Sequence, residues 1–313
     1  KANNELRMKR ARQLAVAGVT SAAADIQQYL KNPTMRPVNF GITYNINLPT
    51  YRSVTVGEEG AEADHLGTPR LAESRITIYD ESAKVNINHA PASVLQSVLG
   101  LSGDVARSIA ASVPRDGDTS DKQWYLELQE LQARGLISAE DFDESALAQS
   151  LTTYTVIDHR QAAGYVNANK ASSKVLAAYL GITEEQVAGV KAKGPFSSAD
   201  ALHRAVAEIV GPTVNTPPLD PALGYDSRCF RVVCEGRYAR FKGADGEEHY
   251  RTASSEEKRK LLWNNAVSRV EAVLLFAPDG SYEIIHWNVD VNMDTGENTD
   301  VETAAEVDQA VSA

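Results

Sequence analysis

The sequence is poor in cysteine and contains no long apolar stretch. Only two of its 313 residues are cysteines, Cys229 and Cys234, so the fold is not held together by a framework of disulfides. The two lie five residues apart in a segment expected to be a strand, which directs their side chains to opposite faces and prevents a bridge. No apolar run reaches the roughly 18–20 residues that a membrane-spanning helix requires.

Signatures of several enzyme classes are also missing. The sequence has no G-x-x-x-x-G-K-S/T loop, no G-x-G-x-x-G turn, no H-E-x-x-H and no G-x-S-x-G. No histidine lies three or four residues from another, the spacing typical of helical zinc sites; they are His65, His89, His159, His203, His249 and His286. Because no nucleophile, base and orienting group form a pattern, we expect that the protein is not an enzyme.

Composition indicates a globular protein with an acidic surface. Hydrophobic residues make up 43% and charged residues 23%, and 31 basic against 42 acidic residues give a net charge of −11. Such a surface repels phosphate backbones, so nucleic-acid binding would need a local basic patch. The length suggests two domains, or one domain with a large insertion.

Residues 5–30 are expected to form one amphipathic helix. Small and apolar residues recur along it at steps of three or four, a stripe that suits close packing on a sheet or a neighbouring helix; it includes Ala11, Ala15, Gly18, Val19, Ala22 and Ile26. The first twelve residues carry one acid and five cations: Lys1, Arg7, Lys9, Arg10 and Arg12. Cations at the positive end of a helix dipole, without an N-cap, suggest that the helix is cut from a longer one.

An internal repeat lies in the middle of the chain. Residues 85–101 align with residues 166–182 without gaps, and both begin with V-N-x-N before a short apolar helix. The asparagines are expected to hold turn backbone and each glycine to end a helix in the left-handed conformation; they are Asn86, Asn88, Gly100, Asn167, Asn169 and Gly181. A second short helix follows in each copy. The repeat therefore predicts two helix-hairpin-helix units, near residues 85–110 and 166–191.

Strand patterns precede and follow this helical region. Residues 38–80 look extended, with a mobile loop at 57–70 and a short strand at 75–79, and residues 122–149 are expected to be helical. That helix would bury Trp124, Leu126, Leu128, Leu131, Leu136 and Phe142. A charged insertion spans 243–260, residues 261–263 could form a short helix, and a hairpin is expected at 269–289 around a turn at 277–280.

This order predicts a helical block inserted into an α+β domain whose sheet is completed late in the sequence. The predicted parts are 1–84 (helix and first strands), 85–222 (inserted helices), 223–291 (closing strands) and 292–313 (an acidic tail).

The start of the acidic segment offers one candidate metal site. Asp290, Asn292, Asp294 and Glu302 follow a calcium-loop pattern in which Thr295 is inserted before Gly296. Three hard oxygens would point inward and Glu302 would close the shell. The alternative is a solvated tail with chance spacing, so calcium remains one of two possibilities.

The combination of segments resembles the K-type minor pseudopilin family of bacterial type II secretion systems, within the pilin superfamily. The resemblance rests on residues 12–22, 79–88, 166–171 with 194–198, and 269–272 leading to 285–287. The chain departs from the family at residues 113–118, which lack the expected Trp. It also departs in the acidic tail, which runs past the usual end of the family.

This resemblance implies a pilin-like N-terminal helix packed on an antiparallel sheet, with a large inserted all-α domain containing the two helix-hairpin-helix-like repeats. It implies a non-enzymatic subunit at the pseudopilus tip that nucleates assembly with I- and J-type minor pseudopilins, joins the major pseudopilin and supports protein export. The partners would bind the small-residue stripe. The protein would be a periplasmic domain held in the inner membrane by an apolar segment before Lys1, and some members of the family bind calcium.

Two alternatives remain at this point. A type IV pilus tip component would share the same features. A periplasmic DNA-binding or DNA-uptake protein would use the hairpins, and residues 100–103 partly match a phosphate-binding hairpin. The second copy places Glu184 and Glu185 where phosphate would lie, so nucleic-acid binding is not expected.

Overall fold

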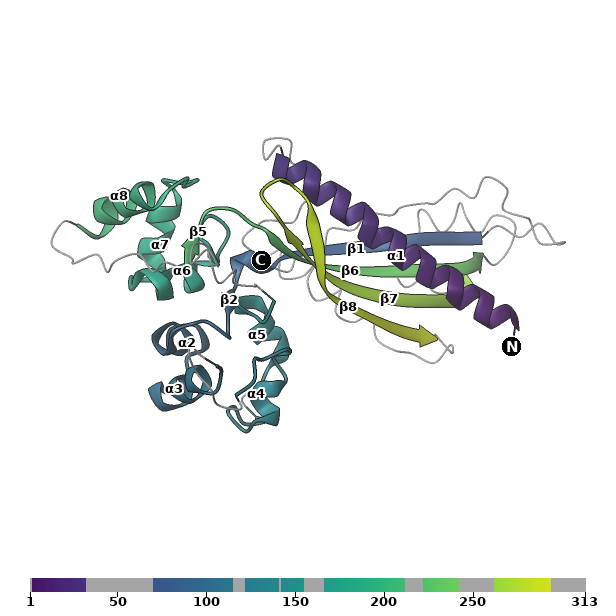
Figure 1. Ribbon diagram of the computed structural model, residues 1–313, viewed down its shortest axis with the longest axis horizontal. Helices are drawn as coiled ribbons and strands as arrows, with labels where there is room; N and C mark the ends of the chain where they lie inside the picture. The colour runs from purple at the N-terminus through teal and green to yellow at the C-terminus, as the bar shows by residue number, and fades with distance from the viewer. Residues whose placement is uncertain are drawn as a thin grey trace.

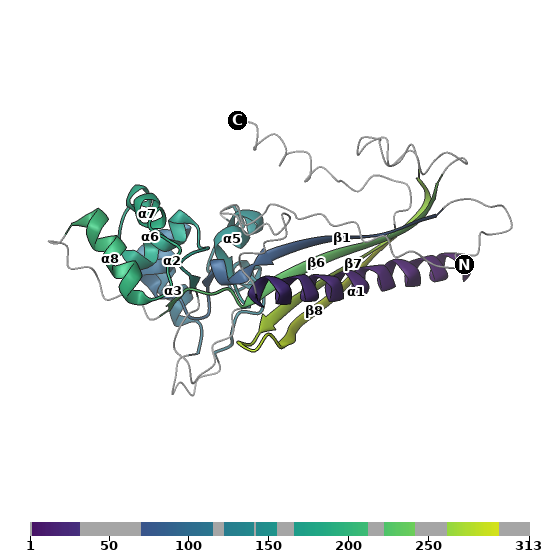
Figure 2. The same cartoon turned by 90° about the horizontal axis from the view of Figure 1, so that it is seen from above.

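A long helix lies across one face of an antiparallel sheet (Figures 1 and 2). The computed structural model describes residues 2–31, 70–114, 122–140, 142–154, 166–211, 222–241 and 262–293. The helix is α1 (Ala2–Lys31), and the sheet has the order β1 (Arg70–Asp80), β6 (Cys229–Phe241), β7 (Leu262–Phe276) and β8 (Tyr282–Met293). Neighbouring strands are antiparallel throughout. One sheet is thus assembled from segments far apart in the sequence.

Helix α1 packs on the sheet through a core of its own. Alternate residues of β6, Phe230, Val232 and Cys234, face this core together with Ile26 of the helix. The backbones approach very closely at Gly236, where a Cβ atom would lie 2.0 Å from the Ala11 carbonyl oxygen. Both cysteines are buried and unbridged.

Seven helices lie between β1 and β6 in the described part of the chain, beyond one end of the sheet (Figure 1). They are α2 (Ala92–Leu99), α3 (Gly103–Ala111), α4 (Glu130–Ala133), α5 (Glu144–Ser150), α6 (Ser173–Leu180), α7 (Glu184–Lys191) and α8 (Ala199–Val210), preceded by the 3₁₀ turn η1 (Glu81–Ala83). Two short parallel strand pairs accompany them: β2 (Val85–Asn86) with β3 (Leu151–Thr152), and β4 (Val166–Asn167) with β5 (Leu223–Gly224). The prediction of an all-α insertion did not include these two strand pairs.

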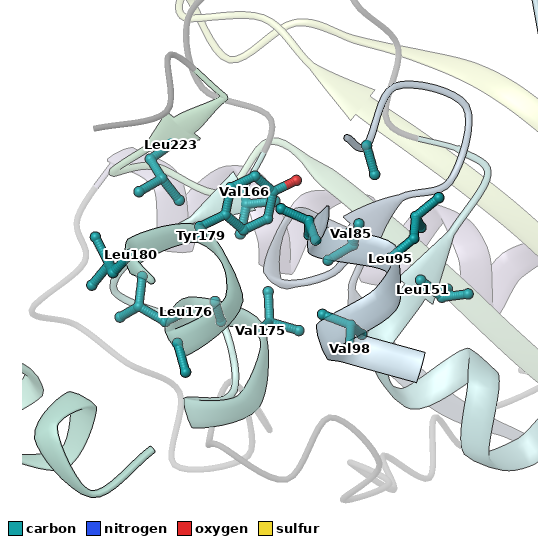
Figure 3. Packing of buried hydrophobic residues seen from close by; sticks show 14 of the residues in the cluster. Val85, Leu95, Val98, Leu151, Val166, Val175, Leu176, Tyr179, Leu180 and Leu223 are labelled. Atoms are coloured by element: carbon teal, nitrogen blue, oxygen red, sulfur yellow. The ribbon is translucent and has the colours of Figure 1, made fainter. Parts of the chain in front are cut away.

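The helical block has a second hydrophobic core (Figure 3). Leu95 and Val98 of α2 lie in it with Val175 and Leu176 of α6, and the two helices pack against each other. Because α2 and α6 occupy equivalent places in the sequence repeat, the two copies share one core.

Two sequence-based predictions are wrong. Residues 122–149 do not form one helix: among the described residues of this range only those of α4 and α5 are helical, and Gly135, with φ +68°, follows α4. Trp124 and Leu126 are consequently 40% and 73% exposed and not part of the core. Leu262 and Trp263 belong to β7 instead of a short helix, because the strand continues along β6 to its end. The extended segment at 38–69 and the charged insertion at 243–260 lie outside the described residues.

Candidate functional site

The first asparagine pair clasps a distant part of the chain. The Asn88 side-chain amide donates to the Tyr125 carbonyl oxygen at 2.9 Å, and its oxygen accepts from the Tyr125 N–H at 2.8 Å. Asn86 orients this clasp, since its side-chain oxygen accepts from the Asn88 N–H at 2.9 Å. One side chain thereby satisfies both backbone groups of a buried residue, as a neighbouring strand would.

The second copy repeats this arrangement. Asn169 donates to the Phe196 carbonyl oxygen at 2.9 Å and accepts from the Phe196 N–H at 2.6 Å. It also donates to the carbonyl oxygen of Tyr225 at 3.0 Å. Asn167 again accepts from the N–H two residues later, at 2.9 Å. In both copies, therefore, the asparagines fix long-range contacts as well as a local turn.

The segment held by Asn88 is also contacted by Arg134. Its guanidinium lies 4.2 Å from the centre of the Tyr125 ring and donates to the carbonyl oxygens of Gln123 and Trp124. Burial raises the pKa of the Tyr125 phenol, which shares a hydrogen bond with Ser112. This segment without regular secondary structure takes the place of the helix expected from the sequence.

A buried group of charges lies where the chain leaves the sheet for the helical block. Lys84 Nζ lies 2.8 Å from Glu81 Oε1, and each side chain is 2% exposed. Arg231 of β6 approaches the same carboxylate at 3.1 Å and reaches Glu271 of β7 at 3.5 Å. Burial acts to raise the pKa of Glu81, but the charges of Lys84 and Arg231 outweigh it and hold that pKa below its usual value. Burial lowers the pKa of Lys84.

A hydrogen-bonded chain beside these charges connects the sheet to the second copy. Asp80 is buried at the end of β1, where it accepts from the Ser227 hydroxyl and, at 3.0 Å, from the Ser82 N–H. Ser227 in turn accepts from the Asn167 amide at 2.8 Å. Burial raises the pKa of Asp80 to about 6, against the opposing effect of the Ser227 hydrogen bond and the Lys170 charge. The junction between sheet and helices is therefore tied by polar contacts.

The small-residue stripe of α1 does not form a surface for partners, and that prediction is wrong. Ala11, Ala15 and Ala22 are fully buried against this chain's own sheet; Val19 and Ile26 lie in the same interface. Gly18 is also covered, because a Cβ there would lie 2.2 Å from Ser74 Oγ. The residues of the stripe are small because the helix and the sheet lie close together.

No helix in the described ranges is long and apolar enough to span a membrane.

The predicted hairpins place their glycines as the sequence suggested. Gly100 and Gly181 end α2 and α6 with φ angles of 67° and 65°. Ser102 caps α3, and Thr183 begins α7 with a capping box. Glu184 and Glu185 lie exposed in the first turn of α7, where an approaching phosphate would meet two carboxylates.

The predicted calcium ligands are only partly within the described residues. Asp290 and Asn292 belong to β8, opposite Arg269 and Val267 of β7, whereas Asp294 and Glu302 lie outside. Over the ranges that the structure covers, no three acidic, histidine or cysteine side chains cluster as a metal site would require. The calcium site remains a prediction.

The junction charges were not recognised as a site from the sequence. The available signal was the polar run Asp80-Glu81-Ser82 followed by Lys84, directly between an apolar strand and V-N-I-N. Their partners Ser227 and Arg231 lie about 150 residues away, as the Arg231–Glu81 separation shows. Nothing in the sequence marks that pairing.

These features define an α+β protein in which one long helix covers an antiparallel sheet, as in pilin-like folds. Among solved structures, the chain is similar to one in the crystal structure of the GspK-GspI-GspJ complex from the type 2 secretion system of enterotoxigenic Escherichia coli. The TM-score is 0.57 at 12% identity, over 93% of this chain and 99% of that chain. The expected resemblance to type II secretion minor pseudopilins is thus confirmed at the level of the fold. No family model and no curated protein sequence matches the chain.

Proposed function

We propose that this protein is a non-enzymatic minor pseudopilin that occupies the tip of a type II secretion pseudopilus and nucleates its assembly. The observation that carries the proposal is the fold shared with one chain of the GspK-GspI-GspJ complex, over 93% of this chain and 99% of that chain. Agreement over nearly both whole chains includes the helical block as well as the helix and sheet. Sharing the sheet alone would support only membership of a much wider class.

The helical block supports the position at the tip. Helices α2–α8 extend the molecule beyond the end of the sheet (Figure 1), so the head is larger than α1 and the sheet alone. A head enlarged in this way would fit the end of a filament but collide with neighbours inside a shaft. We further propose that residues 85–222 act as one inserted domain. Its two helix-hairpin-helix units would each be closed by an asparagine clasp and a parallel strand pair.

The partners proposed are the I- and J-type minor pseudopilins, followed by the major pseudopilin, in the periplasm at the inner membrane. Because the inner side of α1 is buried on its own sheet, such partners would use its exposed side, which includes Lys9, Gln13, Val16 and Thr20. A type IV pilus tip component would use the same surfaces.

Purified periplasmic domains of the I- and J-type minor pseudopilins from the same bacterium provide the test. Size-exclusion chromatography with light scattering should show a complex containing one copy of each protein. Fluorescence anisotropy with duplex DNA at low salt should show no binding, as expected for a chain with a net charge of −11. Absence of the complex together with micromolar, salt-sensitive DNA binding would replace the proposal with the nucleic-acid alternative.

A further inference from the structure

Strand β8 exposes three large apolar side chains. Tyr282, Ile284 and Trp287 are 36%, 49% and 42% exposed, and β8 is an edge strand among the strands that the structure describes. Scattered apolar residues are ordinary on protein surfaces, but three on one face of one strand are more than scatter. We call these three residues the β8 face.

The strand register places the β8 face on the side of the sheet that α1 covers. Tyr282 pairs with Phe276, Ile284 with Leu274 and Trp287 with Ala272. Directly paired residues of antiparallel strands point to the same side, and the three β7 partners lie in the core beneath α1. The core therefore continues outward from β7 to β8, where it becomes exposed.

The width of a helix explains the exposure. A helix about 10 Å across covers roughly two strands spaced about 4.8 Å apart. Helix α1 packs mainly on β6 and β7 and meets the β7–β8 turn only at its end, where Gln27 donates to the Gly280 carbonyl oxygen at 2.9 Å. Figures 1 and 2 show no second helix on this face among the described elements. A second helix beside α1 would complete the layer.

The occupant is constrained by charge and by backbone geometry. The exposed charged residues of α1 are three cations, Lys9, Arg12 and Lys31, and one acid, Glu5, in a chain with a net charge of −11. This local excess of positive charge favours a partner with acidic residues. Addition of a strand is disfavoured, because the register of β7 and β8 shifts between Val273 and Leu274, and such a bulge bends the edge.

We propose that the β8 face, beside α1, docks an amphipathic helix of a partner minor pseudopilin, apolar toward β8 and acidic toward α1. This inference rests on the proposed function and adds the surface and the chemistry of the partner. The large aromatic Trp287 would supply most of the apolar contact, as aromatic side chains do at many interfaces.

Isothermal titration calorimetry with the purified I- and J-type domains tests the proposal, using the domain that binds the unaltered protein. Trp287→Ala should weaken its affinity at least about tenfold. The matched control is Trp124→Ala, an equally exposed tryptophan on the helical block, which should leave the affinity unchanged. Ile284→Thr, which keeps a β-branched residue in the strand, should also weaken binding if Trp287→Ala proves unstable.

Further measurements separate the possible outcomes. Lys9→Glu with Arg12→Glu should weaken binding and reduce its dependence on salt. If the Trp287 and Ile284 variants both bind with unchanged affinity, the β8 face is not the docking surface, while the proposed function remains intact. Failure of the unaltered protein to bind either domain overturns the proposed function itself. Slowed hydrogen exchange of the outward β8 amides in the complex would identify an added strand and refute a docked helix.

Discussion

The asparagine clasp of the first copy makes a quantitative prediction about stability. Asn88→Ala removes two hydrogen bonds, at 2.8 and 2.9 Å, to the backbone of Tyr125, a residue that is 1% exposed. Each hydrogen bond contributes about 1 kcal/mol net, and each buried backbone group left without a partner costs about 1–3 kcal/mol. Alanine offers no replacement donor or acceptor. We therefore expect the free energy of unfolding of the helical block to fall by about 2–4 kcal/mol.

Urea unfolding followed by far-ultraviolet circular dichroism measures this loss. The slope of the transition should be the same in both proteins, which checks that both unfold between the same states. The control is Asn288→Ala on the exposed surface of β8, which should change stability by less than about 0.5 kcal/mol. Hydrogen exchange of the Tyr125 amide should accelerate in Asn88→Ala. A loss below about 0.5 kcal/mol, with that amide still protected, would refute the view that the asparagine holds the segment.

Three further predictions concern the junction and the close approach of α1. The pKa of Asp80 is raised from 3.8 to about 6, so folding favours its protonated form, and stability should increase by about 1 kcal/mol from pH 7 to pH 5. Asp80→Asn should abolish this increase in thermal melts at the two pH values. Lys84→Ala leaves Glu81 buried without its nearest cation and should cost about 3–5 kcal/mol in urea unfolding, and a loss below about 1 kcal/mol would contradict that pairing. Gly236→Ala should destabilise the protein by about 1–3 kcal/mol or more because its Cβ would collide with the α1 backbone, whereas Gly103→Ala, which meets only flexible side chains, should be tolerated in the same assay.

Local periodicity was sufficient to predict the main strands and the repeated helices. Phe230, Val232 and Cys234 alternate along the sequence and form the buried face of β6, and the glycines at 100 and 181 identified the ends of α2 and α6. The hairpin turn at 277–280 also follows from its residues, since Asp279 accepts from the Ser281 N–H and Gly280 has φ +85°. These features depend on residues close together in the sequence.

Features that depend on distant partners were missed or misread. The apolar residues around Trp124 fit a helix by spacing, but Asn88 and Arg134 hold that segment in a non-helical conformation. The alanine stripe of α1 suits a helix–helix contact and a helix–sheet contact equally well. The glycine at position 236, more than 200 residues away in the chain, is one of the residues that show the sheet to be its partner. The charge of Arg231 likewise stabilises the Glu81 carboxylate only after the sheet has formed.

The position of the protein in the filament tests the central claim most directly. Pseudopili assembled in cells that overproduce the major pseudopilin can be labelled with gold-conjugated antibody against the helical block and viewed by electron microscopy. We predict a single label at one end of each filament, because a head enlarged by α2–α8 would fit only there. Labels spaced along the shaft would contradict the account.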